Sequence, residues 1–429
     1  MSEDRFDAIV VGAGPAGIAS AYILAREGKN VLVIERGNSA GDKNVTGGRL
    51  YSYALDLVES GLWQEAALER KVVREKTMIM HGEQAITVDY LDPAVTSAGQ
   101  RPQSYTILRA VFDEWFAAQA EEKGAIIACG VKVDELLQEN GRVIGVKAGE
   151  DEMLADIVIA ADGVNSFMAQ QAGLIHDITA ESVAVGVKEV IELPAKTIEE
   201  RFHLAPEEGA AMMILGCTEG IHGGGFLYTN RDSISLGCVF MPEEAARHGR
   251  QVHDIMQDFK MHPAIYPMIA DGQTIEYSAH LVSEAGYRGI PKKIYKDGFL
   301  MVGDAAGFVI NTGYSIRGID LAIVSGVAAA RAILAEPDAG KVGLRYMQEL
   351  KELKMLPTMQ AVDGYFDLLE IQRIYKHYPA MANDLAAFMY KADGNVASSL
   401  KKAIRPIMKR NGITMWQLLK DGIRGYKSI

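Results

Sequence analysis

The chain has 429 residues, of which 48% are hydrophobic and 23% charged, and its net charge is −12. This length allows two or three structural units with sizeable cores, and the acidic balance argues against nucleic acid as the main ligand. No run of about 18 apolar residues occurs, and the first residues, MSEDRFD, lack the apolar stretch of a signal peptide. We therefore expect a cytoplasmic protein.

The cysteines Cys129, Cys217 and Cys238 stand far apart and form no C-x-x-C pair. A self-contained iron–sulfur site usually needs four thiolates at short spacings, so the sequence excludes one. It also excludes a disulfide framework. Redox chemistry in this chain must therefore belong to an organic cofactor.

The first recognisable unit spans residues 5–35. An apolar run from Phe6 to Val11 predicts a strand buried on both faces. A glycine-rich turn, a helical stretch and a second apolar run, residues 30–34, follow before Glu35. This order of strand, turn, helix, strand and acid is typical of a dinucleotide site.

The turn reads Gly12-x-Gly14-x-x-Gly17. Its glycines permit, in order, a tight turn, close approach of the backbone to a pyrophosphate, and close packing of the helix on the strand. The helix N-terminus offers N–H groups to phosphates, and Glu35 can accept hydrogen bonds from ribose hydroxyls. This motif alone leaves both FAD and NAD open.

Two further motifs follow along the chain. Residues 154–166 predict a strand that ends before Asp162-Gly163, and residues 298–307 predict another that ends before Gly303-Asp304. A helix is expected from about Arg317 to residue 335, since this stretch is rich in alanine and lacks proline. Either dipeptide alone would indicate only a turn.

With these motifs in this order, the chain resembles the FAD-binding flavoproteins typified by aromatic hydroxylases and geranylgeranyl reductases. The resemblance implies that Asp304 binds the ribityl hydroxyls of FAD and that the following helix points its N-terminus at the pyrimidine end of the ring. It also places Arg109 near the phosphates, although a solvated arginine at a helix end is an alternative. The loop Gly47-Gly48-Arg49 would approach the flavin ring.

These patterns predict no metal site and no catalytic side chain, because the flavin itself carries the chemistry. The residues that we expect to contact FAD are Gly12, Gly14, Pro15, Ala16, Gly17, Glu35, Arg36, Gly47, Gly48, Arg49, Arg109, Val133, Asp162, Gly163, Gly303, Asp304 and Gly313.

Several segments outside the FAD motifs look like the FixC type, relatives of electron-transfer-flavoprotein:quinone oxidoreductase. They are residues 31–51, 183–190, 223–230, 276–280 and 303–322. The resemblance implies an oxidoreductase that takes electrons from an electron-transfer flavoprotein heterodimer and passes them to a quinone. The larger relatives carry their own iron–sulfur domain. Here a separate, small ferredoxin-like subunit is expected to supply the cluster, within a FixABCX-type complex.

Other functions stay open at this point. One is an NADPH-dependent prenyl or alkene reductase, and another is a non-catalytic subunit that relays electrons. The segment Gly223–Tyr228 fits either an acceptor pocket or a strand that begins with a glycine bulge. Arg317 fits either an acceptor contact or a structural ion pair.

The expected fold class is α/β: a Rossmann-like FAD-binding domain of the glutathione-reductase/hydroxylase type, an interleaved mixed-sheet acceptor domain and a helical C-terminus. The predicted divisions are 1–73, 104–166 and 296–335 for the FAD-binding domain, 74–103 and 167–295 for the quinone-side domain, and 336–429 for the helical region.

The C-terminal segment from Val396 to Ile429 contains eight basic residues and one acid. It also has an apolar helical stripe that includes Met415, Trp416 and Ile423. The segment could dock an acidic partner subunit, rest peripherally on the inner face of an anionic membrane, or pack on its own domain with its basic residues outward.

Overall fold

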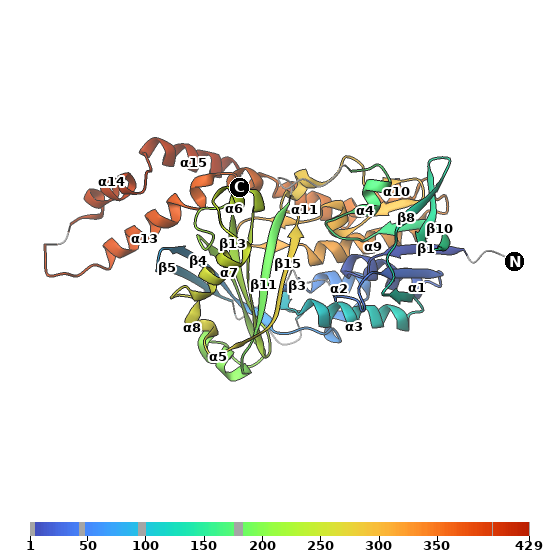
Figure 1. Cartoon of the computed structure of the whole chain (residues 1–429), viewed down its shortest axis with the longest axis horizontal. Helices are drawn as coiled ribbons and strands as arrows, with labels where there is room; N and C mark the ends of the chain where they lie inside the picture. The colour runs from blue at the N-terminus through green and yellow to red at the C-terminus, as the bar shows by residue number, and fades with distance from the viewer. Residues whose placement is uncertain (1–4, 43–47, 93–99, 176–182, 397, 429) are drawn as a thin grey trace.

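The structure is a computed structural model of the chain and describes residues 5–42, 48–92, 100–175, 183–396 and 398–428. Figure 1 shows an elongated molecule, with the N-terminal strand at one end and the C-terminal helices at the other. Two large sheets form its centre. No helix within the described ranges is long and apolar enough to cross a membrane.

The first sheet is parallel at its core, with the order β17-β10-β1-β2-β7. Strands β16, β8 and β9 extend it in antiparallel fashion. Its strands are β1 (Phe6–Val11), β2 (Val31–Glu35), β7 (Ile126–Cys129), β8 (Glu135–Glu139), β9 (Arg142–Ala148), β10 (Asp151–Ala160), β16 (Tyr295–Lys296) and β17 (Phe299–Met301).

Three helices pack together beside this sheet (Figure 1). They are α1 (Pro15–Arg26), α3 (Arg109–Glu122) and α9 (Ile319–Ala335), and α1 contacts both of the others. Almost every residue of α1 is buried, and so are most residues of α9, as expected for alanine-rich helices packed on a sheet. Short helices α2 (Tyr53–Val58) and α10 (Val342–Glu352) also pack against α9.

The second sheet is mixed and runs in the order β15-β11-β14-β13-β12-β4-β6-β3, with β5 paired to β4. Its strands are β3 (Arg49–Tyr51), β4 (Lys71–His81), β5 (Gln84–Leu91), β6 (Ser104–Thr106), β11 (Ala184–Glu192), β12 (Glu208–Leu215), β13 (Gly223–Thr229), β14 (Ser233–Phe240) and β15 (Gln273–Val282). A core shared with helices α5 (Ala195–Phe202), α7 (Val252–Met261) and α8 (Tyr266–Ile269) lies on one face. Helix α6 (Pro242–Arg247) follows β14.

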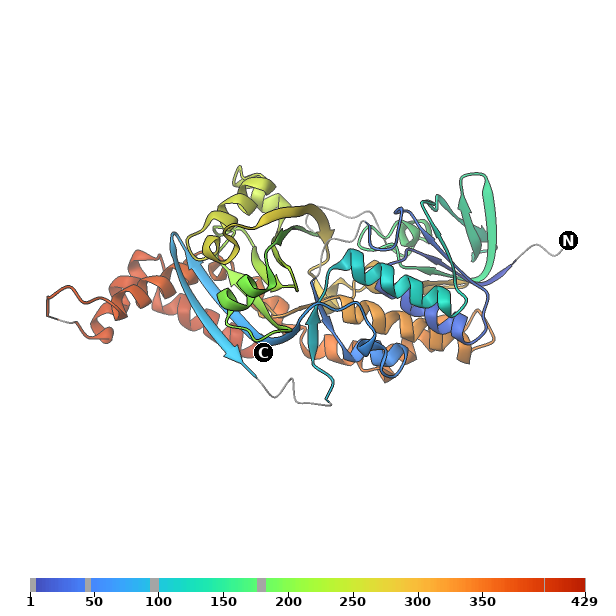
Figure 2. The same cartoon turned by 90° about the horizontal axis from the view of Figure 1, so that it is seen from below.

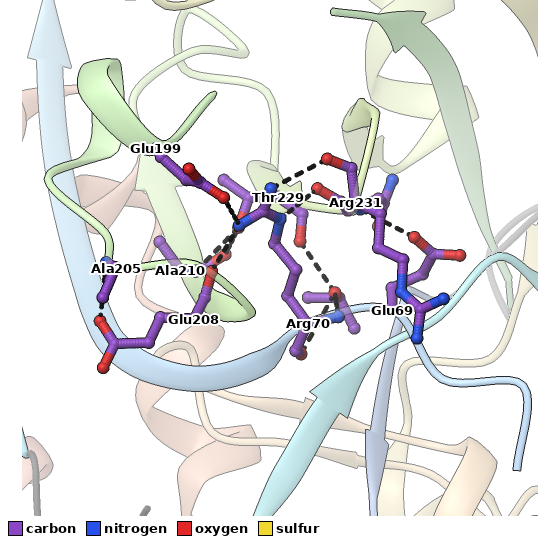
Figure 3. A network of polar contacts seen from close by, with 10 residues as sticks. Glu69, Arg70, Glu199, Ala205, Glu208, Ala210, Thr229 and Arg231 are labelled. Carbon is purple, nitrogen blue, oxygen red and sulfur yellow. Dashed lines mark hydrogen bonds and ion pairs between the residues drawn. The ribbon is translucent and has the colours of Figure 1, made fainter. Parts of the chain in front are cut away.

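The second sheet is tied together by Arg70, just before β4 (Figure 3). This side chain is 2% exposed, and its guanidinium donates to the carbonyl oxygens of Asn230, Arg231 and Glu208 at 2.6, 2.9 and 3.1 Å. It also pairs with Glu199 of α5 at 3.2 Å. One buried cation therefore connects β4 to the β13–β14 turn, to β12 and to α5.

The C-terminal region is helical, as predicted. Figure 2 shows its helices beside the long strands β4 and β5, and α13 contacts both strands. Its elements are α11 (Met355–Ala361), α12 (Gly364–Leu369), α13 (His377–Met389), α14 (Leu400–Arg410) and α15 (Met415–Ser428).

Most predicted elements are present, with two informative differences. Helix α9 begins at Ile319 rather than Arg317, because Ile316–Arg317 form strand β19, which pairs with β18 (Ile310–Asn311). Strands β3 and β6, from ranges assigned to the FAD-binding domain, pair within the second sheet instead. The predicted domain boundaries therefore stay a prediction. Segments assigned to the FAD-binding domain also contribute strands to the second sheet.

A candidate flavin site between the two sheets

A cavity of about 490 Å³ lies where the parallel strands of the first sheet meet the second sheet. Val11, Ala161 and Val302, at the carboxyl ends of β1, β10 and β17, line one side. Residues of β13, β14 and β15 line the other. Ligands of open α/β sheets bind at the carboxyl ends of the strands, so this cavity is the candidate cofactor site.

The glycine turn after β1 is tightly constrained. Gly12 has a φ of +109°, and a Cβ there would lie 2.3 Å from the carbonyl oxygen of Ala161. At Gly17 a Cβ would lie 2.1 Å from the carbonyl oxygen of Gly12. The close helix–strand packing predicted from this motif is therefore present. Gly14 caps α1 without a side-chain acceptor, and Gly14, Pro15 and Ala16 line the cavity.

Glu35, the last residue of β2, is held by backbone groups. Its Oε2 accepts the N–H of Ala13 at 2.9 Å and its Oε1 accepts the N–H of Gly37 at 2.6 Å. The carboxylate lines the cavity next to Arg36. Each carboxylate oxygen has a second lone pair, so Glu35 can still accept hydrogen bonds from a ribose.

Asp162, after β10, fits a site built for a polar ligand. Its Oδ2 accepts the N–H of Met168 at 2.9 Å, whereas its buried Oδ1 has no hydrogen-bond partner within the described chain. Burial raises the pKa of Asp162 to about 6. A buried oxygen without a partner is costly, and a ligand that donates a hydrogen bond nearby would relieve this cost.

Asp304 lies in the cavity among charged groups. Its carboxylate is accessible from the cavity, although protein atoms surround it on most sides. Burial raises its pKa, and the positive charges of Arg109 and His280 oppose this shift. Arg109 itself is buried and pairs with the buried Asp113 at 2.7 Å. The alternative of a solvated arginine at the helix end is therefore wrong.

Packing against Tyr228 requires a glycine at position 48, apart from the predicted approach of this loop to a flavin ring. A Cβ at this position would lie 2.6 Å from Cδ2 of Tyr228, so the Tyr228 ring covers the glycine. Tyr228 stacks with Phe226 at 5.4 Å between ring centroids, and both rings line the cavity. The neighbouring Arg49 is held by Glu75 and donates to Ser104 at 3.0 Å.

The structure brings most of the predicted FAD residues together, since the residues that line the cavity include Gly12, Gly14, Pro15, Ala16, Glu35, Arg36, Gly48, Arg49, Arg109, Val133, Asp162, Gly163, Gly303 and Asp304. Gly17 and Gly313 do not line it. Gly17 acts on helix packing, and a Cβ at Gly313 would instead meet Leu369 at 3.1 Å. Gly47 lies outside the described residues.

The two segments with open interpretations can now be placed. Gly223–Tyr228 belongs to β13, where a Cβ at Gly223 would lie 2.1 Å from the carbonyl oxygen of Val239. This segment is therefore a strand, and its residues Phe226 and Tyr228 also form part of the cavity wall. Arg317 forms an ion pair with the buried Asp320 and stacks on Tyr51 at 4.9 Å. The structural ion pair is therefore present.

Sequence reasoning missed several lining residues, among them Lys132, Asn165, His280 and Glu284. His280 lines the cavity together with Asp304, and burial lowers the pKa of His280. Asn165 lies within the second motif and His280 ends one of the FixC-type segments, whereas no motif marks Lys132 or Glu284. The described residues contain no group of three or more His, Cys, Asp and Glu side chains able to hold a metal ion.

Comparison with known proteins places the chain. Residues 5–335 match the FAD binding domain family, and residues 365–429 match the ETF-QO/FixC family C-terminal domain. Protein FixC of Salmonella typhi is 45% identical over 430 residues, which cover 99% of each chain. The probable electron transfer flavoprotein-quinone oxidoreductase YdiS of Escherichia coli is 44% identical over 432 residues, again 99% of each.

Solved structures of lower similarity share the fold. A geranylgeranyl bacteriochlorophyll reductase-like protein from Thermoplasma acidophilum superposes with a TM-score of 0.71 at 20% identity, covering 95% of this chain and 96% of that one. A flavin-dependent brominase has a TM-score of 0.65 at 16% identity, covering 99% of each. With FAD as its cofactor, the chain belongs to the ETF-QO/FixC family of FAD-dependent oxidoreductases.

Proposed function

We propose that this oxidoreductase accepts electrons from an electron-transfer flavoprotein heterodimer and passes them to a quinone, as the FixC-like subunit of a FixABCX-type complex. The observation that carries the proposal is the shape of the cavity. One end is built from the dinucleotide motifs of the first sheet, and the other opens onto aromatic side chains of the second sheet. FAD, when bound, supplies the uptake and release of electrons.

The chain's own residues have defined tasks in this proposal. The N-terminus of α1 and the glycine turn hold the pyrophosphate, and Glu35 holds the adenosine ribose. Asp304 binds the ribityl chain, and Arg109 beside it offsets negative charge. The N-terminus of α9, which lines the cavity through Gly318 and Ile319, favours negative charge on a reduced ring.

The acceptor end is formed by Phe226, Tyr228 and His280. Flat aromatic rings suit a flat, weakly polar acceptor, because stacking and apolar contact both contribute to its binding. This chemistry supports a quinone as the acceptor. The same surface would also accept a prenyl chain, so an alkene reductase stays the second candidate.

We propose that the exposed surface of the last two helices binds the small, ferredoxin-like iron–sulfur subunit. The apolar stripe of α15 is not packed on the chain: Trp416 is 73% and Leu419 55% exposed, whereas Asp421 and Gly425 face inward. Plain packing with basic residues outward therefore does not describe this helix. The same two helices carry the exposed basic residues Lys401, Lys402, Arg405, Lys420, Arg424 and Lys427, which suits an acidic partner.

Anaerobic reduction of the flavin tests the donor. Purified protein is mixed either with reduced electron-transfer flavoprotein or with NADPH, and flavin absorbance is followed. Fast bleaching by the flavoprotein and not by NADPH is the expected result. Fast bleaching by NADPH alone would replace the proposal with an alkene reductase.

Reoxidation tests the acceptor. The reduced protein is mixed with a short-chain ubiquinone analogue, and the return of flavin absorbance is followed. Rapid reoxidation with quinol formation is expected. A protein that binds FAD and accepts electrons from the flavoprotein, but reduces no quinone, would instead be a relay subunit.

A further inference from the structure

A second cavity, of about 730 Å³, adjoins the candidate flavin site. It lies between the segment that follows β15, helix α6 and the region around α12. Val164, Ser283, Glu284 and Asp304 line both cavities. Among these, Glu284 stands out because it follows β15, the strand that supplies His280 to the first cavity.

Glu284 is held in place without an ionic partner. Its Oε2 accepts a hydrogen bond from Nδ2 of Asn311 at 2.7 Å. No ion pair of Glu284 with Lys, Arg or His is found in the part of the chain that the structure describes. Burial raises the pKa of Glu284 to about 7, and the hydrogen bond from Asn311 opposes this shift. A carboxyl group in this position can be protonated near neutral pH.

The surroundings of Glu284 can exchange protons with solvent. Asp304 and His280 line the first cavity together with Glu284. The second cavity is lined by the titratable side chains His222, Glu243, Glu244, Arg247, Arg288 and Glu370. His222 stacks on Tyr375 at 4.5 Å between ring centroids, and burial lowers its pKa.

Most of the cations there are already paired. Arg288 binds Asp363 and Asp367 at 3.0 and 2.8 Å, and Arg247 pairs with Glu243 at 3.5 Å. These pairs leave the side of the cavity near Glu284 without a dedicated counter-ion among the described residues. The second cavity is thus a polar compartment, and two acids, Glu284 and Asp304, line both it and the first cavity.

We propose that Glu284 delivers protons to the acceptor and regains them through the second cavity. This inference rests on the proposed function. Reduction of a quinone to a quinol consumes two electrons, which come from the donor through FAD, and two protons. In each delivery the O–H bond of Glu284 breaks while an O–H bond forms on a quinone oxygen, and the carboxylate then regains a proton from the bulk solvent through the second cavity.

Two properties of Glu284 support this role: its side chain lines both cavities, and its pKa is suitable for a proton donor. General acids work best when their pKa lies near the working pH, because they are then both protonated and able to release the proton. Glu284 meets this condition, as its pKa of about 7 shows. The rate of proton delivery should be constant at low pH and fall as pH rises above about 7.

The test compares two acceptors in the full-length protein with FAD bound. The quinone analogue takes up protons, whereas the ferricenium ion accepts single electrons without protons. Glu284→Gln keeps the size and hydrogen bonding of the side chain but cannot release a proton. We expect reoxidation by the quinone to slow about 100-fold or more, with the ferricenium rate unchanged. The fall of the quinone rate above about pH 7 should disappear.

The matched control is Glu192→Gln. Glu192 ends β11, pairs with Gln273 at the far end of β15 from Glu284, and lines neither cavity. Its rates with both acceptors should equal those of the wild type. The FAD content and absorbance of both variants report whether the cofactor site is intact.

Three results would overturn the inference. If Glu284→Gln reduces the quinone at the wild-type rate and with the wild-type pH profile, then Glu284 delivers no protons although the acceptor is right. If both acceptors slow equally, the residue serves cofactor placement. If wild-type protein is reoxidised by ferricenium but not by the quinone, the proposed acceptor itself fails, and the role of Glu284 fails with it.

Discussion

At the scale of single residues, the cavity depends on positions where no side chain fits. Gly12 combines a φ of +109° with a backbone carbonyl oxygen only 2.3 Å from where a Cβ would lie, whereas Gly28, with a φ of +78°, has nothing within 4 Å of that point. At both positions the positive φ disfavours any residue with a side chain. Only at Gly12 would an added Cβ also collide with a backbone atom. Substituting each glycine in turn therefore distinguishes the effect of backbone strain from the effect of a steric clash.

Gly28→Ala should cost about 1–2 kcal/mol of unfolding free energy and keep a full complement of FAD. Gly12→Ala should lose most of its FAD, because the turn and the Ala161 loop must separate to admit the methyl group. Flavin content after purification and urea unfolding of each variant check this. Equal FAD content in the two variants would show that the turn adapts.

Arg109 has two tasks that a double variant can separate. Arg109→Met should lower the unfolding free energy by about 3–5 kcal/mol, because it removes one partner of a buried ion pair. Adding Asp113→Leu should restore most of this stability. FAD should nevertheless bind at least tenfold more weakly to the double variant, as measured by fluorescence titration of apoprotein. Wild-type affinity in the double variant would assign Arg109 a purely structural task.

The raised pKa of Glu284 also predicts how the stability of the protein depends on pH, and this can be measured without an electron acceptor. A raised pKa in the folded state means that folding is penalised once the unfolded carboxyl ionises, between about pH 4.5 and 7. Glu284→Gln should therefore stabilise the protein at pH 8 by as much as about 3 kcal/mol. The gain should shrink to near zero by about pH 4. Denaturant melts across this range, with Glu192→Gln as the flat control, measure it.

At the scale of secondary-structure elements, Arg70 carries an unusual share of the connections in the second sheet. Arg70→Met should lower the unfolding free energy by about 3–5 kcal/mol, because several carbonyl groups and Glu199 lose their donor in a buried site. Arg231→Met is the natural control, since its exposed side chain lies in the same turn (Figure 3). Its cost should stay within about 0.5 kcal/mol. Thermal melts compare the two.

Sequence patterns predicted those helices and strands well that depend on interactions between residues close together in the chain. Phe6–Val11 is a strand as expected, because a continuous apolar run can only be buried on both faces. Arg109 begins α3 as expected. The strands β3 and β6 were not predicted, because three residues carry no measurable alternation and their pairing depends on distant segments.

The candidate site divides in the same way. Residues of the nucleotide motifs could be predicted, since each motif fixes a turn at the end of its own strand. Glu284 could not, because its environment is created where two separate cavities meet. For α15, the sequence predicts an amphipathic helix but not which face turns inward. The ion pair between the buried Asp421 and the half-buried Arg373, at 2.6 Å, decides that.

At the scale of the whole molecule, the basic C-terminal surface makes the proposed iron–sulfur partner testable. Lys420→Glu with Lys427→Glu should weaken binding of the iron–sulfur subunit by tenfold or more, and wild-type affinity should fall as salt rises. Lys196→Glu is the control, because Lys196 is also exposed but lies on α5. Calorimetry or biolayer interferometry measures the affinities.

The alternative occupant of this surface is an anionic membrane. Flotation with vesicles of phosphatidylglycerol and phosphatidylethanolamine distinguishes the two. If the wild type binds these vesicles, the double variant does not, and binding of the subunit is unaffected by the substitutions, then the membrane occupies this surface.

The order of the strands in the first sheet has a consequence for how the protein is made. Strand β1 lies next to β10, and β10 lies next to β17, although the three leave the ribosome far apart in time. The cavity receives walls from Val11 through to Ala322. A nascent chain therefore cannot enclose the dinucleotide until α9 has emerged, and before then the exposed edge of β10 is open to wrong pairing. Supply of FAD during synthesis can act only on chains that are nearly complete.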